Sequence, residues 1–175
     1  MGKTINFKDT YPSAITLFSK WAEIGKDEGM EKGHAKSVNF MFDKLKPFLQ
    51  TPFSVLDVGC GNGWVVRKFK EIETCERSLG IDGAEKMILK AQSLDSENQY
   101  VCADILQWSP PQQFNIIHSM EVLYYLKNPS ELINTIYSNW LNQKGCFIFG
   151  IDHYTENLPS INWPMECGVN MNTQP

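Results

Sequence analysis

The sequence lacks the features that mark secreted and membrane-spanning proteins. Its 175 residues contain no apolar run of about 18 residues, and its first stretch, MGKTINFKDTYPSAITLF, lacks the uninterrupted apolar segment of a secretory signal. The five cysteines are widely spaced, with no CxxC pair and no Cys/His cluster at zinc-ligand spacing. We therefore expect reduced thiols, a cytoplasmic protein and no membrane partner.

Positive charge is also scarce. The 16 Lys and Arg residues are outnumbered by 20 Asp and Glu residues, which gives a net charge of -4. The basic residues are interleaved with acidic ones instead of forming a block, so nucleic acid is a disfavoured partner. Proline and glycine are too sparse for a low-complexity chain, and the 42% apolar fraction fits one globular domain with a buried core.

The spacing of apolar residues changes near residue 50. Before it, helical spacing predicts helices over 14–24 and about 34–48, separated by a polar link. From residue 53, short apolar runs alternate with helical segments, which is typical of strand-helix-strand units and a mostly parallel sheet. The expected strands are 54–59, 77–82, 99–104, 114–120 and 145–152, and the later helices are 64–72, 84–94 and 129–140, with a turn near 105–108.

The segment VLDVGCGNGW, residues 55–64, is the most informative part of the chain. An apolar strand runs into Gly59-x-Gly61-x-Gly63, and a helix begins at once. Glycines suit such a turn because a side chain would keep the backbone away from a ligand and would resist the dihedral angles required. The next strand ends in Asp82, 21 residues beyond Gly61, where a carboxylate can accept both hydroxyls of a ribose.

Two kinds of site compete for this pattern: a nicotinamide or flavin dinucleotide site and an S-adenosylmethionine site. Dinucleotide sites favour GxGxxG, in which a helix N-terminus meets a pyrophosphate. This chain has GxGxG preceded by Asp57, a carboxylate that is poorly placed beside phosphates but well suited to an ammonium group. The spacing therefore favours S-adenosylmethionine.

With these motifs, residues 54–152 resemble the class I, Rossmann-like S-adenosylmethionine-dependent methyltransferases of the small-molecule type. VLDVGCGNGW is similar to the first motif of that family, LGIDGAEKMI to its acidic second-strand motif, and VCADILQW to its third-strand motif. FNIIHSMEVLYYL resembles the fourth-strand segment that leads from the cofactor pocket to the acceptor pocket. The resemblance implies an α/β fold with a mostly parallel sheet flanked by helices.

The resemblance also implies a cofactor, S-adenosylmethionine, with S-adenosylhomocysteine as product. Gly59, Gly61 and Gly63 would cradle its methionine and ribose portions, with Asp57 near the amino group. Cys60 would be an ordinary small residue of the same turn.

Further cofactor contacts follow from the second, third and fourth strands. Asp82 would bind the ribose hydroxyls, and Asp104 would accept a hydrogen bond from the adenine amine while Ile105 packs against the ring. The remaining expected contacts are Gly83, Met87, Ser119 and Met120. Two alternatives stay open, because a strand-end Asp can be a helix cap and Met87 at helical spacing can be a core residue.

The reaction implied is a direct in-line displacement onto a small-molecule acceptor, to which the protein contributes positioning and desolvation. It requires no metal. Candidate bases are His153, His118 and Glu121, although for His153 a structural or solvent-facing histidine is the favoured interpretation. Trp21, His34 and Tyr124 are candidates for the acceptor site or its lid. A wider aromatic group could line an apolar or cationic pocket: Trp64, Trp108, Tyr124, Tyr125 and Trp163.

We expect three regions: lid helices over 1–50, the cofactor-binding core over 51–152, and an irregular tail over 153–175. Too few residues follow Asp152 for the sixth and seventh strands usual in the family, so strand 145–152 would be an apolar sheet edge. Such an edge predicts a homodimer or larger homo-oligomer. The alternative function is a non-catalytic S-adenosylmethionine-binding module or a truncated fragment.

Overall fold

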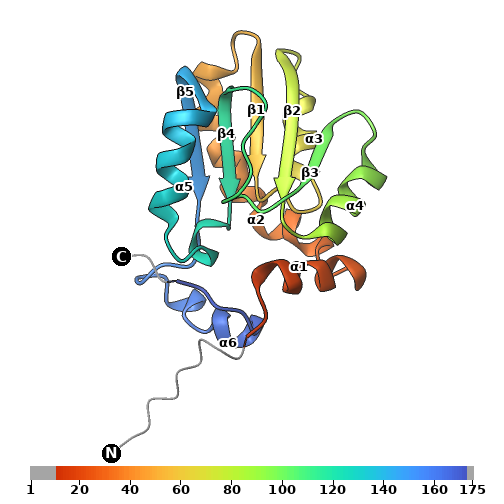
Figure 1. Ribbon diagram of the computed structural model, residues 1–175, viewed down its shortest axis with the longest axis vertical. Coiled ribbons are helices and arrows are strands. Elements are labelled where there is room, and N and C mark those ends of the chain that lie inside the picture. The colour runs from red at the N-terminus through yellow and green to blue at the C-terminus, as the bar shows by residue number, and fades with distance from the viewer. Residues whose placement is uncertain (1–10, 173–175) are drawn as a thin grey trace, which may run out of the picture.

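A computed structural model of the chain describes residues 11–172, and its centre is one parallel sheet (Figure 1). The strand order is β3-β2-β1-β4-β5, and every neighbouring pair is parallel. The predicted α/β fold is confirmed. The strands are β1 Phe53–Val58, β2 Cys75–Asp82, β3 Gln99–Cys102, β4 Phe114–Met120 and β5 Leu141–Gly150. The connection after β1 leads to β2 on one side, and the connection after β4 leads to β5 on the opposite side. The carboxyl ends of β1 and β4 therefore form a topological switch point, which favours ligand binding.

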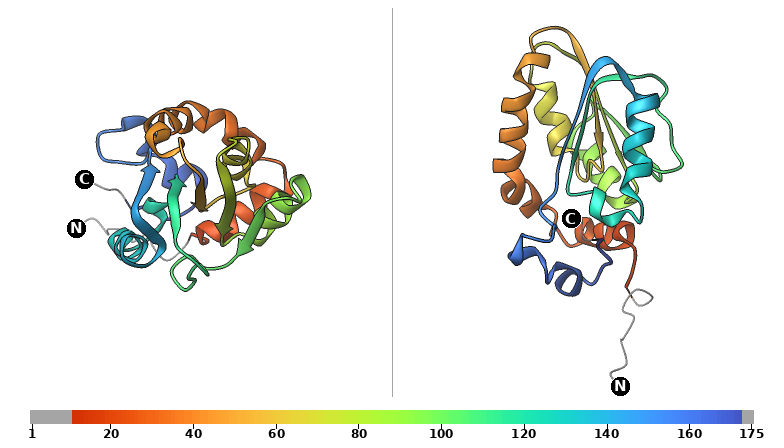
Figure 2. Two further views of the ribbon diagram at one scale, coloured as in Figure 1. Left: turned by 90° about the horizontal axis from the view of Figure 1, so that it is seen from above. Right: turned by 90° about the vertical axis from the view of Figure 1, so that its left-hand side faces the viewer.

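Helices cover both faces of the sheet, as Figure 2 shows from the side. Helices α2 (Glu28–Leu45), α3 (Trp64–Lys70) and α4 (Glu85–Leu94) lie on one face. On the other face lies α5 (Pro129–Thr135), which continues as the π-helical turn η4 (Ile136–Trp140). Helices α1 (Ala14–Glu23) and α6 (Trp163–Cys167) lie beyond the carboxyl ends of the strands (Figure 1).

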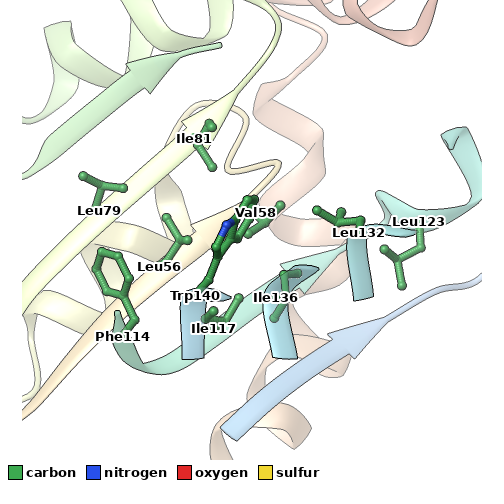
Figure 3. Close-up of a cluster of buried hydrophobic side chains, with 10 residues drawn as sticks. All are labelled: Leu56, Val58, Leu79, Ile81, Phe114, Ile117, Leu123, Leu132, Ile136 and Trp140. Atoms are coloured by element: carbon green, nitrogen blue, oxygen red, sulfur yellow. The ribbon is translucent and has the colours of Figure 1, made fainter. Parts of the chain in front are cut away.

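The apolar core is divided by the sheet into two main layers. On β4, the adjacent residues Ile116 and Ile117 are both fully buried but belong to different clusters, because side chains alternate between the faces of a strand. Ile116 packs in the cluster that contains Val38 and Phe69. Ile117 belongs to the cluster in Figure 3, with Trp140 from η4. Burial on both faces explains why these strands read as continuous apolar runs.

The largest differences from the sequence-based element boundaries are in α2 and β5. Helix α2 begins at Glu28, not near residue 34, so Gly29 and Gly33 lie inside it. Each glycine weakens a helix by roughly 0.5–1 kcal/mol, but the burial of Val38 and Leu45 offsets that cost. Strand β5 begins at residue 141 and ends at residue 150, because the turn η4 runs directly into it.

The region after β5 is more ordered than the irregular tail that we predicted. It contains the 3-10 turn η5 (Leu158–Ser160) and α6, in which Pro164 occupies the first turn and Gly168 ends the helix with φ +63°. The backbone N–H of Asn172 donates to the Tyr124 carbonyl at 2.6 Å. The segment therefore packs against the turn that follows β4.

Strand β5 forms one edge of the sheet. Across residues 11–172, no strand pairs with its outer side. A shallow groove runs between this strand and α2, and Phe40 and Phe149 are 61% and 42% exposed there.

None of the helices within the described range is long and apolar enough to cross a membrane.

Candidate functional site

A glycine turn joins β1 to α3 and forms one wall of the candidate site. Gly59, Gly61 and Gly63 have φ values of +75°, +53° and +77°, in the left-handed region that other residues enter at a cost of about 1–2 kcal/mol. A Cβ atom on Gly59 would also lie 2.2 Å from the Cγ2 atom of Val122. Both the turn and this close approach therefore require glycine.

Asp82, at the end of β2, holds this turn in place. Its Oδ2 atom accepts a hydrogen bond from the backbone N–H of Gly61 at 2.9 Å, and its Oδ1 atom accepts from Ala84 N–H at 2.7 Å. Burial raises the pKa of Asp82, while the backbone N–H groups of Ala84, Gly61 and Gly83 oppose the rise. A carboxylate offers about four lone-pair positions, so about two remain for a ligand.

A cavity of about 230 Å³ opens beside Asp82. It lies at the carboxyl ends of β1, β2 and β4, where the switch point of the sheet favours ligand binding. The predicted site residues that line it are Gly59, Asp82, Gly83, Asp104, Ile105, Met120 and Glu121. The structure thus brings together residues from the ends of four strands, β1 to β4, that are far apart in the sequence.

Helix α1, which belongs to the expected lid region 1–50, covers the cavity with Ile15 and Phe18. None of the ten residues of α1 is buried, and Ile15 remains 46% exposed. The apolar face of this helix is therefore turned toward the cavity and not into a core. The remaining lining residues come from the start of α1 and from the turn after β4: Ser13, Ala14, Val122, Tyr125 and Leu126.

Asp57 and His118 do not line this cavity. Asp57 was expected near the amino group of the cofactor, and His118 was a candidate base. They are register partners on β1 and β4, so both side chains point to the same face of the sheet. The Oδ1 atom of Asp57 lies 2.7 Å from Nδ1 of His118, and both residues are buried. The His118 ring packs against Phe69 of α3 with centroids 5.9 Å apart. The pair is part of the core.

Cys60, Met87 and Ser119 are also buried and do not line the cavity. Burial raises the pKa of the Cys60 thiol well above its usual value, which disfavours a nucleophilic thiolate. The Ser119 hydroxyl donates to the Val58 carbonyl at 2.9 Å. Gly61 and Gly63 shape the turn but are not in the cavity wall.

Among the residues expected at the acceptor site or its lid, none lines the cavity. Trp21 packs edge-on against Phe18, with ring centroids 5.2 Å apart, and so supports the cavity wall from behind. His153 is buried with its Nδ1 atom 3.0 Å from the Ser160 carbonyl, because the ordered tail encloses it. His34 lies with its Nδ1 atom 4.0 Å from an Asp152 carboxylate oxygen, and burial lowers the pKa of His34.

Glu121 is the candidate base that does face the cavity. Its backbone has φ +60°, an uncommon conformation for a residue other than glycine. Its Oε2 atom accepts from the Tyr124 hydroxyl at 2.7 Å, and its Oε1 atom accepts from the backbone N–H of Asp152 at 2.7 Å. Burial raises the pKa of Glu121 from 4.5 to about 7, so its carboxyl can exchange a proton near neutral pH.

This pKa has a consequence for stability. The pKa of Glu121 is about 7 in the folded state and near 4.5 in the unfolded state, so the folded state binds more protons between about pH 4.5 and 7. The contribution of Glu121 to the free energy of unfolding is therefore largest below about pH 4.5 and is lost as pH rises through about 7. We expect this loss to be on the order of 3 kcal/mol in wild type and absent in Glu121→Gln. Urea denaturation across this pH range measures it, and parallel profiles for the two proteins would contradict it.

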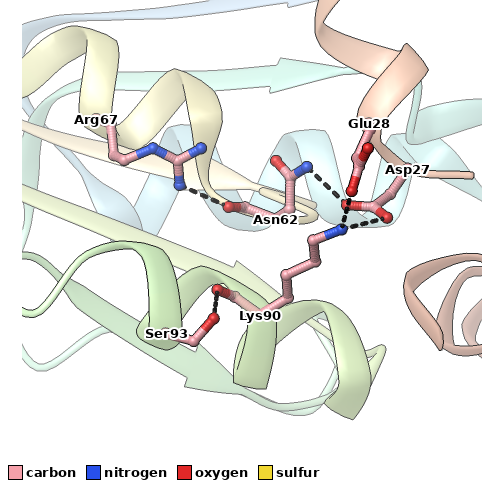
Figure 4. A network of polar contacts seen from close by, with 6 residues as sticks. All are labelled: Asp27, Glu28, Asn62, Arg67, Lys90 and Ser93. Atoms are coloured by element: carbon pink, nitrogen blue, oxygen red, sulfur yellow. Dashed lines mark hydrogen bonds and ion pairs between the residues drawn. The ribbon is translucent and has the colours of Figure 1, made fainter. Parts of the chain in front are cut away.

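A buried carboxylate that the sequence analysis missed supports the glycine turn from the other side (Figure 4). Asp27, just before α2, is 0% exposed. Its Oδ2 atom accepts from the Asn62 side-chain amide at 2.9 Å, and its Oδ1 atom lies 2.9 Å from Nζ of Lys90 on α4. Arg67 donates to the Asn62 carbonyl at 2.7 Å. The network links α2, the glycine turn, α3 and α4.

Replacing Asp27 with alanine should lower the free energy of unfolding by about 2 kcal/mol, because Asn62 and Lys90 lose their shared acceptor. The effect is smaller than for a fully buried pair since the Lys90 side chain is 22% exposed. Urea denaturation measures the change. Glu28→Gln is the control: its side chain is 74% exposed and it also contacts Lys90, so a change within about 0.5 kcal/mol is expected. Equal effects of the two substitutions would contradict the role of Asp27.

Comparisons with known proteins agree with this architecture. A family model described as a methyltransferase domain matches residues 27–168. Trans-aconitate 2-methyltransferase of Escherichia coli is 34% identical over 91 residues, which is 52% of this chain and 36% of that protein. The match thus spans only about a third of the length of the curated relatives.

Two solved structures are similar over larger parts of the chain. A chain from the complex between the Haloferax volcanii Trm112 methyltransferase activator and a methyltransferase has a TM-score of 0.77 at 24% identity, covering 89% of this chain and 69% of that one. An S-adenosylmethionine-dependent methyltransferase from Mesorhizobium loti has a TM-score of 0.54 at 28% identity, covering 62% of this chain and 53% of that one.

The first of these likenesses supports the fold, and the family match extends from the buried Asp27 to the end of α6. The match covers well over half of the 175 residues, including the glycine turn, Asp82 and all five strands. This chain therefore belongs to the family of methyltransferase domains.

Proposed function

We propose that this chain binds S-adenosylmethionine in the cavity beside Asp82 and acts as a methyltransferase on a small-molecule acceptor. One observation carries the proposal: the Asp82 carboxylate lines the cavity while it fixes the glycine turn through Gly61. The name of the Mesorhizobium loti relative, which specifies S-adenosylmethionine, supports the choice of cofactor.

The residues at one end of the cavity fit the adenosine part of this cofactor. Asp82 retains lone pairs for two ribose hydroxyls, and Asp104 accepts from Leu106 N–H with only its Oδ1 atom. Asp104 can therefore also accept from an adenine amine, and Ile105 offers an apolar surface for the ring. Gly83 leaves the necessary space, since a Cβ atom there would lie 2.7 Å from Ile15 Cδ1.

When bound, the cofactor supplies an already activated methyl group. The task of the chain is then to orient the acceptor and exclude water. Helix α1 is placed for the second task, because Ile15 and Phe18 cover the cavity beyond the strand ends. We propose that residues 11–50, the described part of the expected lid region 1–50, close the site, while 51–152 hold the cofactor. Residues 1–10 lie outside the described range.

Calorimetric titration with S-adenosylmethionine and S-adenosylhomocysteine tests the binding step. We expect saturable binding of both and none of a nicotinamide dinucleotide, which a GxGxxG site would prefer. Transfer of labelled methyl groups to a metabolite mixture tests the reaction. If the chain bound the dinucleotide but neither S-adenosylmethionine nor S-adenosylhomocysteine, the proposal would be overturned.

We also propose that β5 pairs with a second copy of the chain. Among the described strands it has a neighbour on one side only, and Phe149 is 42% exposed on it. Light scattering should show a dimer for wild type and a monomer for Phe149→Lys. Tyr137→Lys is the matched control, since Tyr137 is 79% exposed on η4, and it should remain dimeric. A wild-type monomer at high micromolar concentration would contradict this proposal.

A further inference from the structure

We infer that the methyl acceptor is an amine, held as an ammonium ion by Glu121 and by the aromatic rings of Phe18 and Tyr125, and that carboxylate acceptors are excluded. This inference rests on the proposed function and names the acceptor class for the same cavity. It differs from what the name of the Escherichia coli relative specifies, since trans-aconitate is a carboxylate.

The cavity wall contains two chemically different groups of residues. Asp82, Gly83, Asp104 and Ile105 are the group that fits adenosine, as described above. The other group comes from α1 and from the segment after β4, and its carboxylate is Glu121, accompanied by the hydroxyl side chains of Ser13 and Tyr125. An acceptor beside the cofactor therefore meets the Glu121 carboxylate.

The charge of the cavity wall has one sign. Its ionisable carboxylates are Asp82, Asp104 and Glu121, and within residues 11–172 the lining side chains include no lysine, arginine or histidine. Two like charges about 4 Å apart repel by roughly 1–4 kcal/mol, from bulk water to a protein surface. A carboxylate acceptor would enter with no cationic side chain of the cavity wall to bind it, whereas an ammonium ion would be attracted by the carboxylates.

Aromatic rings complete the surroundings of such a cation. Phe18 and Tyr125 both line the cavity, and their rings are in edge contact with centroids 5.5 Å apart. A cation over an aromatic face gains about 0.5–2 kcal/mol, more when it is desolvated. The apolar part of an organic amine would also pack against these rings.

Glu121 is held for this contact by neighbours on both sides. Its two oxygens accept from the Tyr124 hydroxyl, in the 3-10 turn η3 (Leu123–Tyr125), and from Asp152 N–H after β5, which fixes the carboxylate although its backbone has φ +60°. Non-glycine residues in this region cost about 1–3 kcal/mol and persist where the surrounding structure imposes them. The strain is thus concentrated at the carboxylate that we assign to the acceptor.

The same carboxylate can take the proton that an ammonium ion must lose. One N–H bond of the bound R–NH₃⁺ breaks, its electron pair stays on nitrogen, and the proton forms an O–H bond with Glu121. The products are R–NH₂ and a neutral carboxyl, and the amine lone pair is then free to accept a methyl group. Burial and the nearby Asp152 raise the pKa of Glu121 to about 7, while the Tyr124 hydroxyl opposes the rise. Proton uptake is therefore accessible near neutral pH.

Calorimetry with three probes of one shape tests the inference: benzylamine, benzyl alcohol and benzoate, each titrated into the full chain saturated with S-adenosylhomocysteine at about pH 8, above the pKa of Glu121. We expect benzylamine to bind at least about tenfold more tightly than the other two. Benzoate binding as tightly as benzylamine would overturn the inference without the use of any variant.

Variants assign the effect to Glu121. Glu121→Gln should weaken benzylamine at least about tenfold and leave S-adenosylhomocysteine affinity within about twofold. Glu76→Gln, an exposed charge at the opposite end of β2, should change neither. Unchanged benzylamine affinity in Glu121→Gln would overturn the inference. Failure of wild type to bind S-adenosylhomocysteine would instead overturn the proposed function, so the two failures are distinguishable.

Discussion

Replacement of Asp82 by alanine should weaken the binding of S-adenosylhomocysteine at least about a hundredfold, which corresponds to about 2.7 kcal/mol. The loss has two physical sources. The ligand loses the acceptor for its ribose hydroxyls, and the glycine turn loses the hydrogen bond from Gly61 N–H at 2.9 Å. A buried N–H without a partner costs about 1–3 kcal/mol. Calorimetric titration of the two proteins measures the difference.

Two further variants show whether this effect belongs to the Asp82 site. Asp82→Asn keeps one acceptor oxygen but places an NH₂ group toward Gly61 N–H or Ala84 N–H, so an intermediate loss is expected. Asp43→Asn removes a 65% exposed carboxylate from α2 and should leave affinity unchanged. Equal affinities of wild type and Asp82→Ala would show that the ligand does not use this carboxylate.

Replacement of Gly59 by alanine should lower the free energy of unfolding by about 3 kcal/mol. The left-handed backbone costs about 1–2 kcal/mol for a residue with a Cβ atom, and overpacking against Val122 adds about 1–3 kcal/mol. Because Gly59 also lines the cavity, the affinity for S-adenosylhomocysteine should fall in the same variant. Urea denaturation and calorimetry measure the two effects.

Gly29→Ala is the matched control, since Gly29 lies inside α2 and a Cβ atom there would meet nothing within 4 Å. It should raise stability by roughly 0.5–1 kcal/mol. Combining Gly59→Ala with Val122→Ala removes the shortest contact, so the pair should be less destabilising than the sum of its members. If Gly59→Ala behaves like Gly29→Ala, the turn does not require glycine.

The parts of the structure that sequence could predict are those set by local periodicity and local motifs. Alternating apolar runs and helical segments predicted the parallel sheet, and all five strands occur where expected apart from a few terminal residues. Glycines at 59, 61 and 63 predicted a left-handed turn, which is present. In each case the residues that determine the feature are close together in the sequence.

The parts that sequence could not predict depend on the partners of polar side chains. Asp57 matched the family pattern, but its register partner His118 is 61 residues away and pairs with it inside the core. Asp27 belonged to a segment interpreted as a polar link, yet it is fully buried between Asn62 and Lys90. No periodicity distinguishes such a carboxylate from a solvated one, because its partners come from distant elements.

The lid region 1–50 was expected to include α1, but the residues of α1 that form the cavity wall were not predicted, for a related reason. Ile15 and Phe18 lie on an apolar stripe, which normally indicates a face packed against a core. The structure instead turns that face toward the cavity, since α1 lies beyond the strand ends and packs on α4. Only the position of the helix separates the two interpretations.

A crystal structure of the chain grown with S-adenosylhomocysteine tests the central claim most directly. The account predicts the ribose hydroxyls within hydrogen-bond distance of the Asp82 carboxylate, with the adenine beside Asp104 and Ile105. Ligand density at any other place, with Asp82 in contact only with Gly61 and Ala84, would contradict it.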